Sequence, residues 1–98
     1  IYPSMKIICN KAGDLTITND FTKSNTCIKG CDLNEIITIN GLTREIVSSN
    51  SEHDIYNDFN YDYFKIGNEM NARDNMITTN LPCVITFSYS PIIKNSPN

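Results

Sequence analysis

The 98-residue chain lacks several features that would point to particular functions. It has no tryptophan, and no apolar run approaches the roughly 20 residues of a membrane-spanning helix, so we expect no transmembrane segment. Its eight lysines and arginines are scattered singly, and the formal net charge is −3. Binding to nucleic acid depends on clustered cations that displace phosphate counterions. We therefore expect no nucleic-acid partner.

Glycosylation acceptors and a signal-peptide pattern are missing as well. No asparagine is followed by any residue and then serine or threonine. Either the chain never enters an endoplasmic reticulum, or it enters one and needs an unmodified surface. The cysteines favour the second interpretation, which is secretion without attached sugars.

Four cysteines are present, at Cys9, Cys27, Cys31 and Cys83. An even number of cysteines in a small domain with a limited core predicts disulfide bonds and an oxidising compartment. Cys27 and Cys31 are expected to flank a turn at Lys29-Gly30, each joined to a distant partner. Four thiolates around zinc are the alternative, but structural zinc sites use two paired cysteine motifs and only one pair occurs here. We therefore expect a disulfide-linked protein that is secreted.

Strand signals dominate the chain, and no stretch of about 12 residues shows helical periodicity. The expected strands lie at Met5–Cys9, Leu15–Thr18, Glu35–Val47, Tyr61–Ile66, Met76–Thr79 and Cys83–Ser90. A single helical turn is expected at residues 68–75. This pattern predicts an all-β fold, a compact antiparallel β-sandwich or Greek-key barrel of about seven or eight short strands. We expect one domain over residues 1–90 and a flexible tail over residues 91–98.

The segment Glu35–Val47 carries the strongest hairpin signal. Asn40-Gly41 separates two β-branched runs, and both residues tolerate the positive φ of a two-residue type I′ turn. Strand alternation around that turn gives one buried face. Its members would be Ile37, Ile39, Leu42 and Ile46.

The acidic segment Asp58–Glu69 has oxygen-bearing side chains at its first, third, fifth and twelfth positions, the ligand spacing of an EF-hand loop. Its sixth position is Tyr63, where the EF-hand has glycine, and flanking amphipathic helices are missing. An EF-hand is therefore not expected. A calcium site built from loops is the remaining cofactor hypothesis, because calcium accepts irregular oxygen cages. Its candidate ligands are Asp54, Asp58 and Asp62.

His53, the only histidine, lies in the polar stretch 48–60, which we expect to form a long exposed loop. A ribonuclease-like site would need this imidazole together with a glutamate and an arginine. The available partners are Glu45 or Glu69 and Arg44 or Arg73. Nothing in the spacing brings them together, and we assign no catalytic residue.

Aromatic residues gather beside the acidic segment, and Tyr56, Phe59, Tyr61 and Tyr63 form the predicted binding surface. Tyrosine-rich surfaces are favoured at protein contacts. We therefore predict a secreted or surface-exposed, non-catalytic protein that binds a protein or cell-surface target, such as a toxin or a host-protein binder. The alternatives are a structural subunit of an extracellular or viral assembly, which implies an oligomer, and a small secreted hydrolase such as a ribonuclease.

Overall fold

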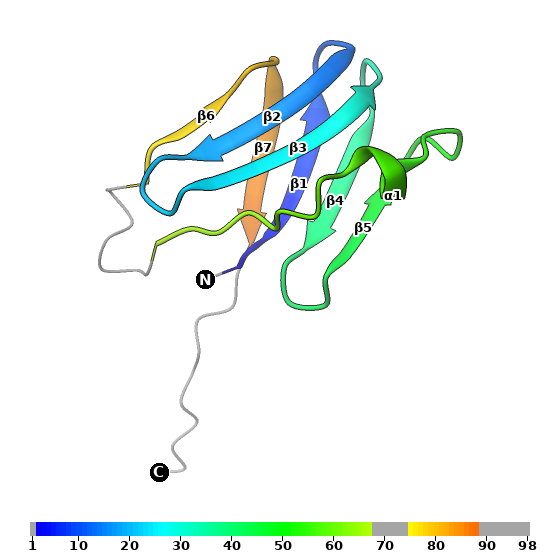
Figure 1. Ribbon diagram of the computed structural model, residues 1–98. Helices are drawn as coiled ribbons and strands as arrows, with labels where there is room; N and C mark the ends of the chain where they lie inside the picture. The colour runs from blue at the N-terminus through cyan, green and yellow to red at the C-terminus, as the bar shows by residue number, and fades with distance from the viewer. Residues whose placement is uncertain (1, 68–74, 89–98) are drawn as a thin grey trace.

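The computed structural model describes residues 2–67 and 75–88, which form a compact β-sandwich of two antiparallel sheets (Figure 1). The elements are β1 (Ser4–Cys9), β2 (Gly13–Asn19), β3 (Ser24–Cys31), β4 (Ile36–Asn40), β5 (Glu45–Ser48), α1 (Ile55–Asp58), β6 (Ile77–Thr79) and β7 (Cys83–Ser88). One sheet has the order β5-β4-β1-β7, and the other has the order β3-β2-β6. The predicted all-β sandwich is confirmed, with seven strands in the described part of the chain.

The connections between strands are either hairpins or crossings from one sheet to the other. The β2–β3 and β4–β5 pairs are antiparallel hairpins. The chain changes sheet between β1 and β2, between β3 and β4, between β5 and β6, and between β6 and β7. As a result, the edge strands β6 and β7 lie at one side of the sandwich, and the edge strands β3 and β5 lie at the other (Figure 1).

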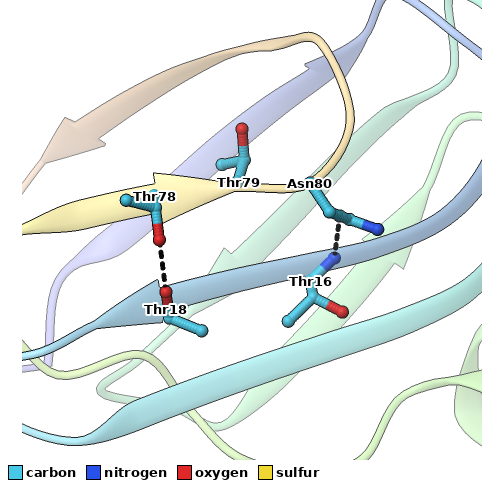
Figure 2. Close-up of a pocket in the computed structure, with 5 residues that line it drawn as sticks. All are labelled: Thr16, Thr18, Thr78, Thr79 and Asn80. Atoms are coloured by element: carbon cyan, nitrogen blue, oxygen red, sulfur yellow. Dashed lines mark hydrogen bonds between the residues drawn. The ribbon is translucent and has the colours of Figure 1, made fainter.

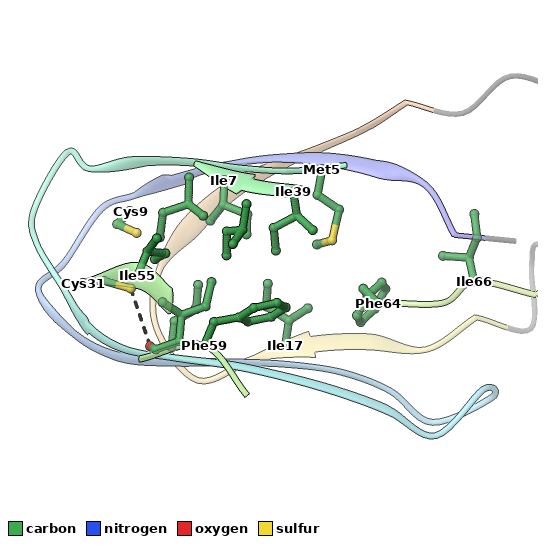
Figure 3. Close-up of a cluster of buried hydrophobic side chains, with 14 residues drawn as sticks. Met5, Ile7, Cys9, Ile17, Cys31, Ile39, Ile55, Phe59, Phe64 and Ile66 are labelled. Atoms are coloured by element: carbon green, nitrogen blue, oxygen red, sulfur yellow. Dashed lines mark hydrogen bonds between the residues drawn. The ribbon is translucent and has the colours of Figure 1, made fainter. Parts of the chain in front are cut away.

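The core lies between the two sheets (Figure 3). Alternate residues of β1, β2 and β4 are fully buried, as strand periodicity requires. The buried apolar residues are Met5, Ile7, Cys9, Leu15, Ile17, Ile28, Cys31, Ile37, Ile39, Ile46, Ile55, Phe59, Phe64 and Ile66. Burying each large apolar side chain stabilises the fold by about 1.5–3 kcal/mol, so this cluster is the main source of stability.

The β4–β5 turn is longer than the predicted two-residue loop. Asn40 pairs with Glu45, so residues 41–44 form the turn, and Arg44 adopts the left-handed φ of 62°. Gly41 is required for a close approach, because a Cβ there would lie 2.7 Å from the backbone oxygens of residues 2 and 3. Ile37, Ile39 and Ile46 are buried as predicted. Leu42 lies in the turn and is exposed, so its predicted place on the buried face is wrong.

Strand β3 occupies the position where the sequence predicts a turn at Lys29-Gly30. Gly30 has a φ of 68°, and the β2–β3 register shifts between Gly13 and Leu15, which is a β-bulge. The bulge interrupts the strict alternation of β3. Cys27 is therefore half-buried at the outer face, whereas Cys31 is buried in the core.

The predicted disulfides are wrong for this structure, because all four cysteines are free thiols. Cys9 and Cys31 are neighbouring core residues (Figure 3), and Cys83 lies opposite Cys9 in the β1–β7 pair. Cys27 lies apart from them, against the hydroxyl of Thr16. Burial raises the pKa values of Cys9 and Cys31. They are therefore protonated, and they pack as small apolar side chains.

Residues 59–67 run beside β3 (Figure 1), but they pair with it only at one isolated bridge, formed by Phe59. The predicted strand Tyr61–Ile66 is not formed. A buried hydroxyl of β3 holds this backbone instead, since Ser24 Oγ accepts a hydrogen bond from the Lys65 N–H at 2.8 Å. The expected long loop at 48–60 contains the short helix α1.

Three further expectations fall wholly or partly outside the described residues. They are most of the helical turn at 68–75, the end of the strand predicted at Cys83–Ser90, and the tail at 91–98. Within the described residues, no helix has the length and apolar character needed to cross a membrane.

Candidate interaction site

The predicted aromatic surface divides into a core half and an exposed half. Phe59 is only 3% exposed and belongs to the core, whereas Tyr56 and Tyr61 are 63% and 53% exposed. The ring centroids of Tyr61 and Tyr63 lie 5.0 Å and 5.3 Å from that of Phe59, so a buried ring supports both tyrosines. The Tyr61 hydroxyl donates to the Tyr56 carbonyl at 2.7 Å. The surface available to a partner therefore consists of Tyr56 and Tyr61.

Arg44 fixes the other end of this aromatic group. Its guanidinium carbon lies 4.6 Å from the ring centroid of Tyr2 and 4.7 Å from that of Tyr63. The Tyr63 hydroxyl donates to the Arg44 carbonyl at 2.8 Å. The cation–π contacts therefore join the β4–β5 turn to the segment that precedes β1 and to residues 59–67.

The alternating polar residues of the acidic segment bind the edge of β3. The Asn60 amide accepts from the Cys27 N–H at 3.0 Å and donates to the Asn25 carbonyl at 2.7 Å. Asp62 Oδ2 accepts from the Asn25 N–H at 2.8 Å. These side chains replace a neighbouring strand, and Tyr61 between them takes a left-handed φ of 62°. The spacing that resembles a calcium loop therefore serves the protein's own backbone.

The three candidate calcium ligands are not brought together. Asp54 accepts from the Asn57 side chain, Asp58 contacts His53, and Asp62 accepts from the backbone of β3. Among residues 2–67 and 75–88, no group of three or more histidine, cysteine, aspartate or glutamate side chains is placed to hold a metal ion.

His53 lies at the centre of a buried polar network, so the expectation of an exposed loop histidine is wrong. Its side chain is 4% exposed. Nδ1 contacts Glu35 Oε2 at 2.6 Å, and Nε2 contacts the Lys29 carbonyl at 2.8 Å and Asp58 Oδ2 at 3.0 Å. Glu35, itself buried, also accepts from the Ser48 hydroxyl. The network joins α1, β3 and β5 through groups that all have partners.

The pKa values of this network are consistent with a charged pair. Burial alone would raise the pKa of Glu35, but hydrogen bonds from Ser48, the Asp32 N–H and His53 lower it overall. Burial alone would lower the pKa of His53, but hydrogen bonds to Glu35 and to the Lys29 carbonyl raise it overall. Both shifts favour the charged forms, and both imidazole nitrogens face acceptor oxygens, so we assign this contact to an imidazolium and a carboxylate.

The ribonuclease-like set is not assembled by the described residues. His53 is paired with Glu35, Glu45 accepts from Thr43, and Arg44 lies between two tyrosine rings. Glu69 and Arg73 lie outside the described residues. Both imidazole nitrogens are hydrogen-bonded within the fold, so the network holds α1 against β3 and β5.

The outer face of β2 and β6 has a shallow hollow lined by Thr16, Thr18, Thr78, Thr79 and Asn80 (Figure 2). The Thr18 and Thr78 hydroxyls are hydrogen-bonded to each other at 2.5 Å. The Thr16 N–H donates to Asn80 Oδ1 at 2.6 Å. These bonds attach β6 to β2. The lining is uncharged and contains no nucleophile paired with a base, so it offers no catalytic group.

The side of the sandwich formed by β6 and β7, which we call the open side, exposes apolar residues. The inward-facing residues Ile85 and Phe87 contact the core and are only partly buried. Met76, Ile77 and Val84 are exposed. Periodicity in Cys83–Ser90 indicated a strand, but its position at a sheet edge depends on long-range pairing. For that reason, the sequence alone did not identify this surface.

Residues 1–89 match the family model described as a phage tail C-terminal domain. The chain belongs to this family. No curated protein and no solved structure matches the chain. Membership of this phage tail family favours the predicted alternative of a structural viral subunit and gives no support to a toxin or effector role. The expected secretion depended on the disulfides, and it stays a prediction.

Proposed function

We propose that this domain is a structural subunit of a phage tail and that it acts by contact with neighbouring tail proteins. The family match over residues 1–89 carries this proposal. The exposed apolar residues of the open side, Met76, Ile77 and Val84, offer side chains that a neighbouring protein could cover. The buried network around His53 has its nitrogens engaged within the fold, which favours contact over catalysis.

The exposed tyrosines provide a second candidate contact surface. Tyr56 and Tyr61 present rigid, amphipathic rings, and a buried ring supports Tyr61 from below. Such rings lose little conformational entropy when a partner orders them. We assign them to contact with a neighbouring tail protein on the side of the sandwich opposite to β6 and β7.

The test is the presence and position of the chain in virions of the phage that encodes it. We expect mass spectrometry of gradient-purified particles to recover its peptides, and gold-labelled antibodies against the folded domain to mark the tail. Antibody that has been pre-absorbed with the domain is the control and should leave particles unlabelled. If the chain occurs in the lysate and is missing from purified virions, or if the label marks only the capsid, the proposed role is wrong.

A further inference from the structure

The outer edge of β7 is unpaired among the described residues, because β7 is the last strand of its sheet. Natural sheets protect such edges with charged side chains, proline, bulges or a covering segment. Strand β7 reads CVITFS and contains neither a charged residue nor proline. Its register with β1 is regular from Cys83 to Ser88, so it has no bulge. The strand is therefore suited to pairing with another chain.

The direction of the free backbone groups follows from the pairing of β1. Cys9 exchanges backbone hydrogen bonds with the chain leading into β4, since its N–H donates to Glu35 and its carbonyl accepts from Asn34. Asn10, the next residue, donates to the Pro82 carbonyl on the other side. In an antiparallel ladder the direction alternates at each residue. The even-numbered residues of β7 therefore direct their backbone N–H and C=O groups towards β1. The odd-numbered residues, Cys83, Ile85 and Phe87, direct theirs towards the free edge.

The charge distribution favours a second copy of this chain as the occupant. The two edge strands of the open side, β6 and β7, contain no charged residue. The formal net charge of −3 makes copies repel each other in general, whereas this uncharged edge can face itself without a like-charge contact. The edge strands of the opposite side each carry a charge, Lys29 in β3 and Glu45 in β5.

We propose that β7 pairs antiparallel with β7 of a second copy around a two-fold axis at Ile85. In this register the residues with free backbone groups lie opposite one another. Ile85 lies opposite Ile85 of the second copy, and Cys83 lies opposite its Phe87. The partly buried inner side chains then become covered, and the two four-stranded sheets form one continuous sheet. Such an interface is isologous and closes as a dimer. The inference rests on the proposed structural role and names one partner for the open side.

Sedimentation velocity over a concentration series tests the dimer. Val84 and Thr86 are exposed on the outer face of β7, and in the proposed register each lies opposite the other across the interface. The double variant V84E/T86E should therefore place like charges together and weaken self-association at least about tenfold. The control variant L42E/V47E adds the same charge at exposed positions on the other side and should associate like the unmodified chain. Circular dichroism should show both variants folded.

Cross-linking tests the register. Val84→Cys and Thr86→Cys chains, both carrying Cys27→Ser and Cys83→Ser, should form a covalent dimer under mild oxidation only when the two are mixed. Cα atoms at such a non-hydrogen-bonded pair lie about 4.5 Å apart, which suits a disulfide. A dimer of Thr86→Cys alone, no cross-link in the mixture, or a wild-type chain that stays monomeric would each overturn the proposal. If antibodies label the tail but the isolated chain stays monomeric, the structural role would stand and only the proposed β7–β7 dimer would be wrong.

Discussion

The edge strands at the two sides of the sandwich differ in whether other segments of the chain cover them. At the side formed by β3 and β5, which we call the covered side, α1 contacts both strands and residues 59–67 run along β3. At the open side, β6 and β7 are the last strands of their sheets, and no further described strand pairs with them. Among the described residues, the chain thus covers one edge with its own segments and leaves the sheet edges at the other unpaired. In a subunit that assembles, this division leaves pairing through a sheet edge to the open side, whereas the covered side offers exposed side chains such as Tyr56 and Tyr61.

The covered side also shows that an edge need not be completed by a strand. The Asn60 amide and the Asp62 carboxylate satisfy backbone groups of β3, and the His53 network joins the helix to the sheet. Backbone groups that are shielded from water without partners are costly, and these side chains supply partners where no neighbouring strand does. Removing members of this arrangement should therefore cost more than comparable changes at the open side.

The largest expected effect is the loss of a core ring from the covered side. Phe59→Ala should lower the free energy of unfolding by about 3–5 kcal/mol, because the residue is buried and supports two tyrosines. Urea unfolding monitored by circular dichroism measures it. Tyr56→Ala, an exposed neighbour, is the control and should change stability by less than about 0.5 kcal/mol. A Phe59→Ala loss as small as that of the control would contradict the covered-side packing.

The next effect concerns the buried charge pair. Glu35→Gln should destabilise the domain by about 2–3 kcal/mol at pH values where His53 is charged, because it removes a charge-assisted hydrogen bond. The folded-state pKa of His53 is raised above 6.5, so its stabilising contribution is complete below pH 6.5 and declines as pH rises through the folded pKa. The pKa of Glu35 is lowered below 4.5, so its contribution is present above pH 4.5 and is lost in more acidic solution.

Unfolding free energies measured between about pH 5.5 and pH 7.5 check this prediction, a range below the pKa of about 8.5 at which thiols of the unfolded chain titrate. The native chain should lose stability towards the upper end of the range. In Glu35→Gln the decline should shrink, since the imidazole loses its carboxylate partner. An identical pH profile in both proteins would show that the pair is not charged.

The smallest expected effect compares one hydrogen-bonding side chain from each side. Asn60→Ala should cost about 1–2 kcal/mol, because two backbone groups of β3 lose their partner. Thr78→Val removes the exposed bond to Thr18 at the open side and should cost less than about 0.5 kcal/mol. Thermal or chemical unfolding of both variants measures the two stability losses for comparison. Equal losses would remove the energetic distinction between the two sides.

The sequence was sufficient to predict the fold class because alternation in β1, β2, β4 and β7 is local. It was not sufficient for β3, because a bulge at Gly30 resembles a turn signal when read alone. The same limit applied to the cysteines, whose even number indicated disulfides although the bulge separates Cys27 from the others.

The candidate site was only partly predictable for a related reason. Tyr56 and Tyr61 are exposed as expected of a binding surface, whereas Phe59 is a core residue. The oxygen spacing at Asp58, Asn60 and Asp62 is real, but its partners are a histidine and a strand edge elsewhere in the chain. Pattern alone identifies which groups need partners. The fold decides which partners they have.

The central place of β1 has a mechanical consequence. The strand is flanked by β4 and β7, both antiparallel to it, and its hydrogen bonds on either side run across its axis. A tension applied at Ser4 along the strand would load both ladders in shear, so their bonds would have to rupture together and could not unzip one at a time. A load that enters the fold through this strand would thereby be resisted by both ladders together.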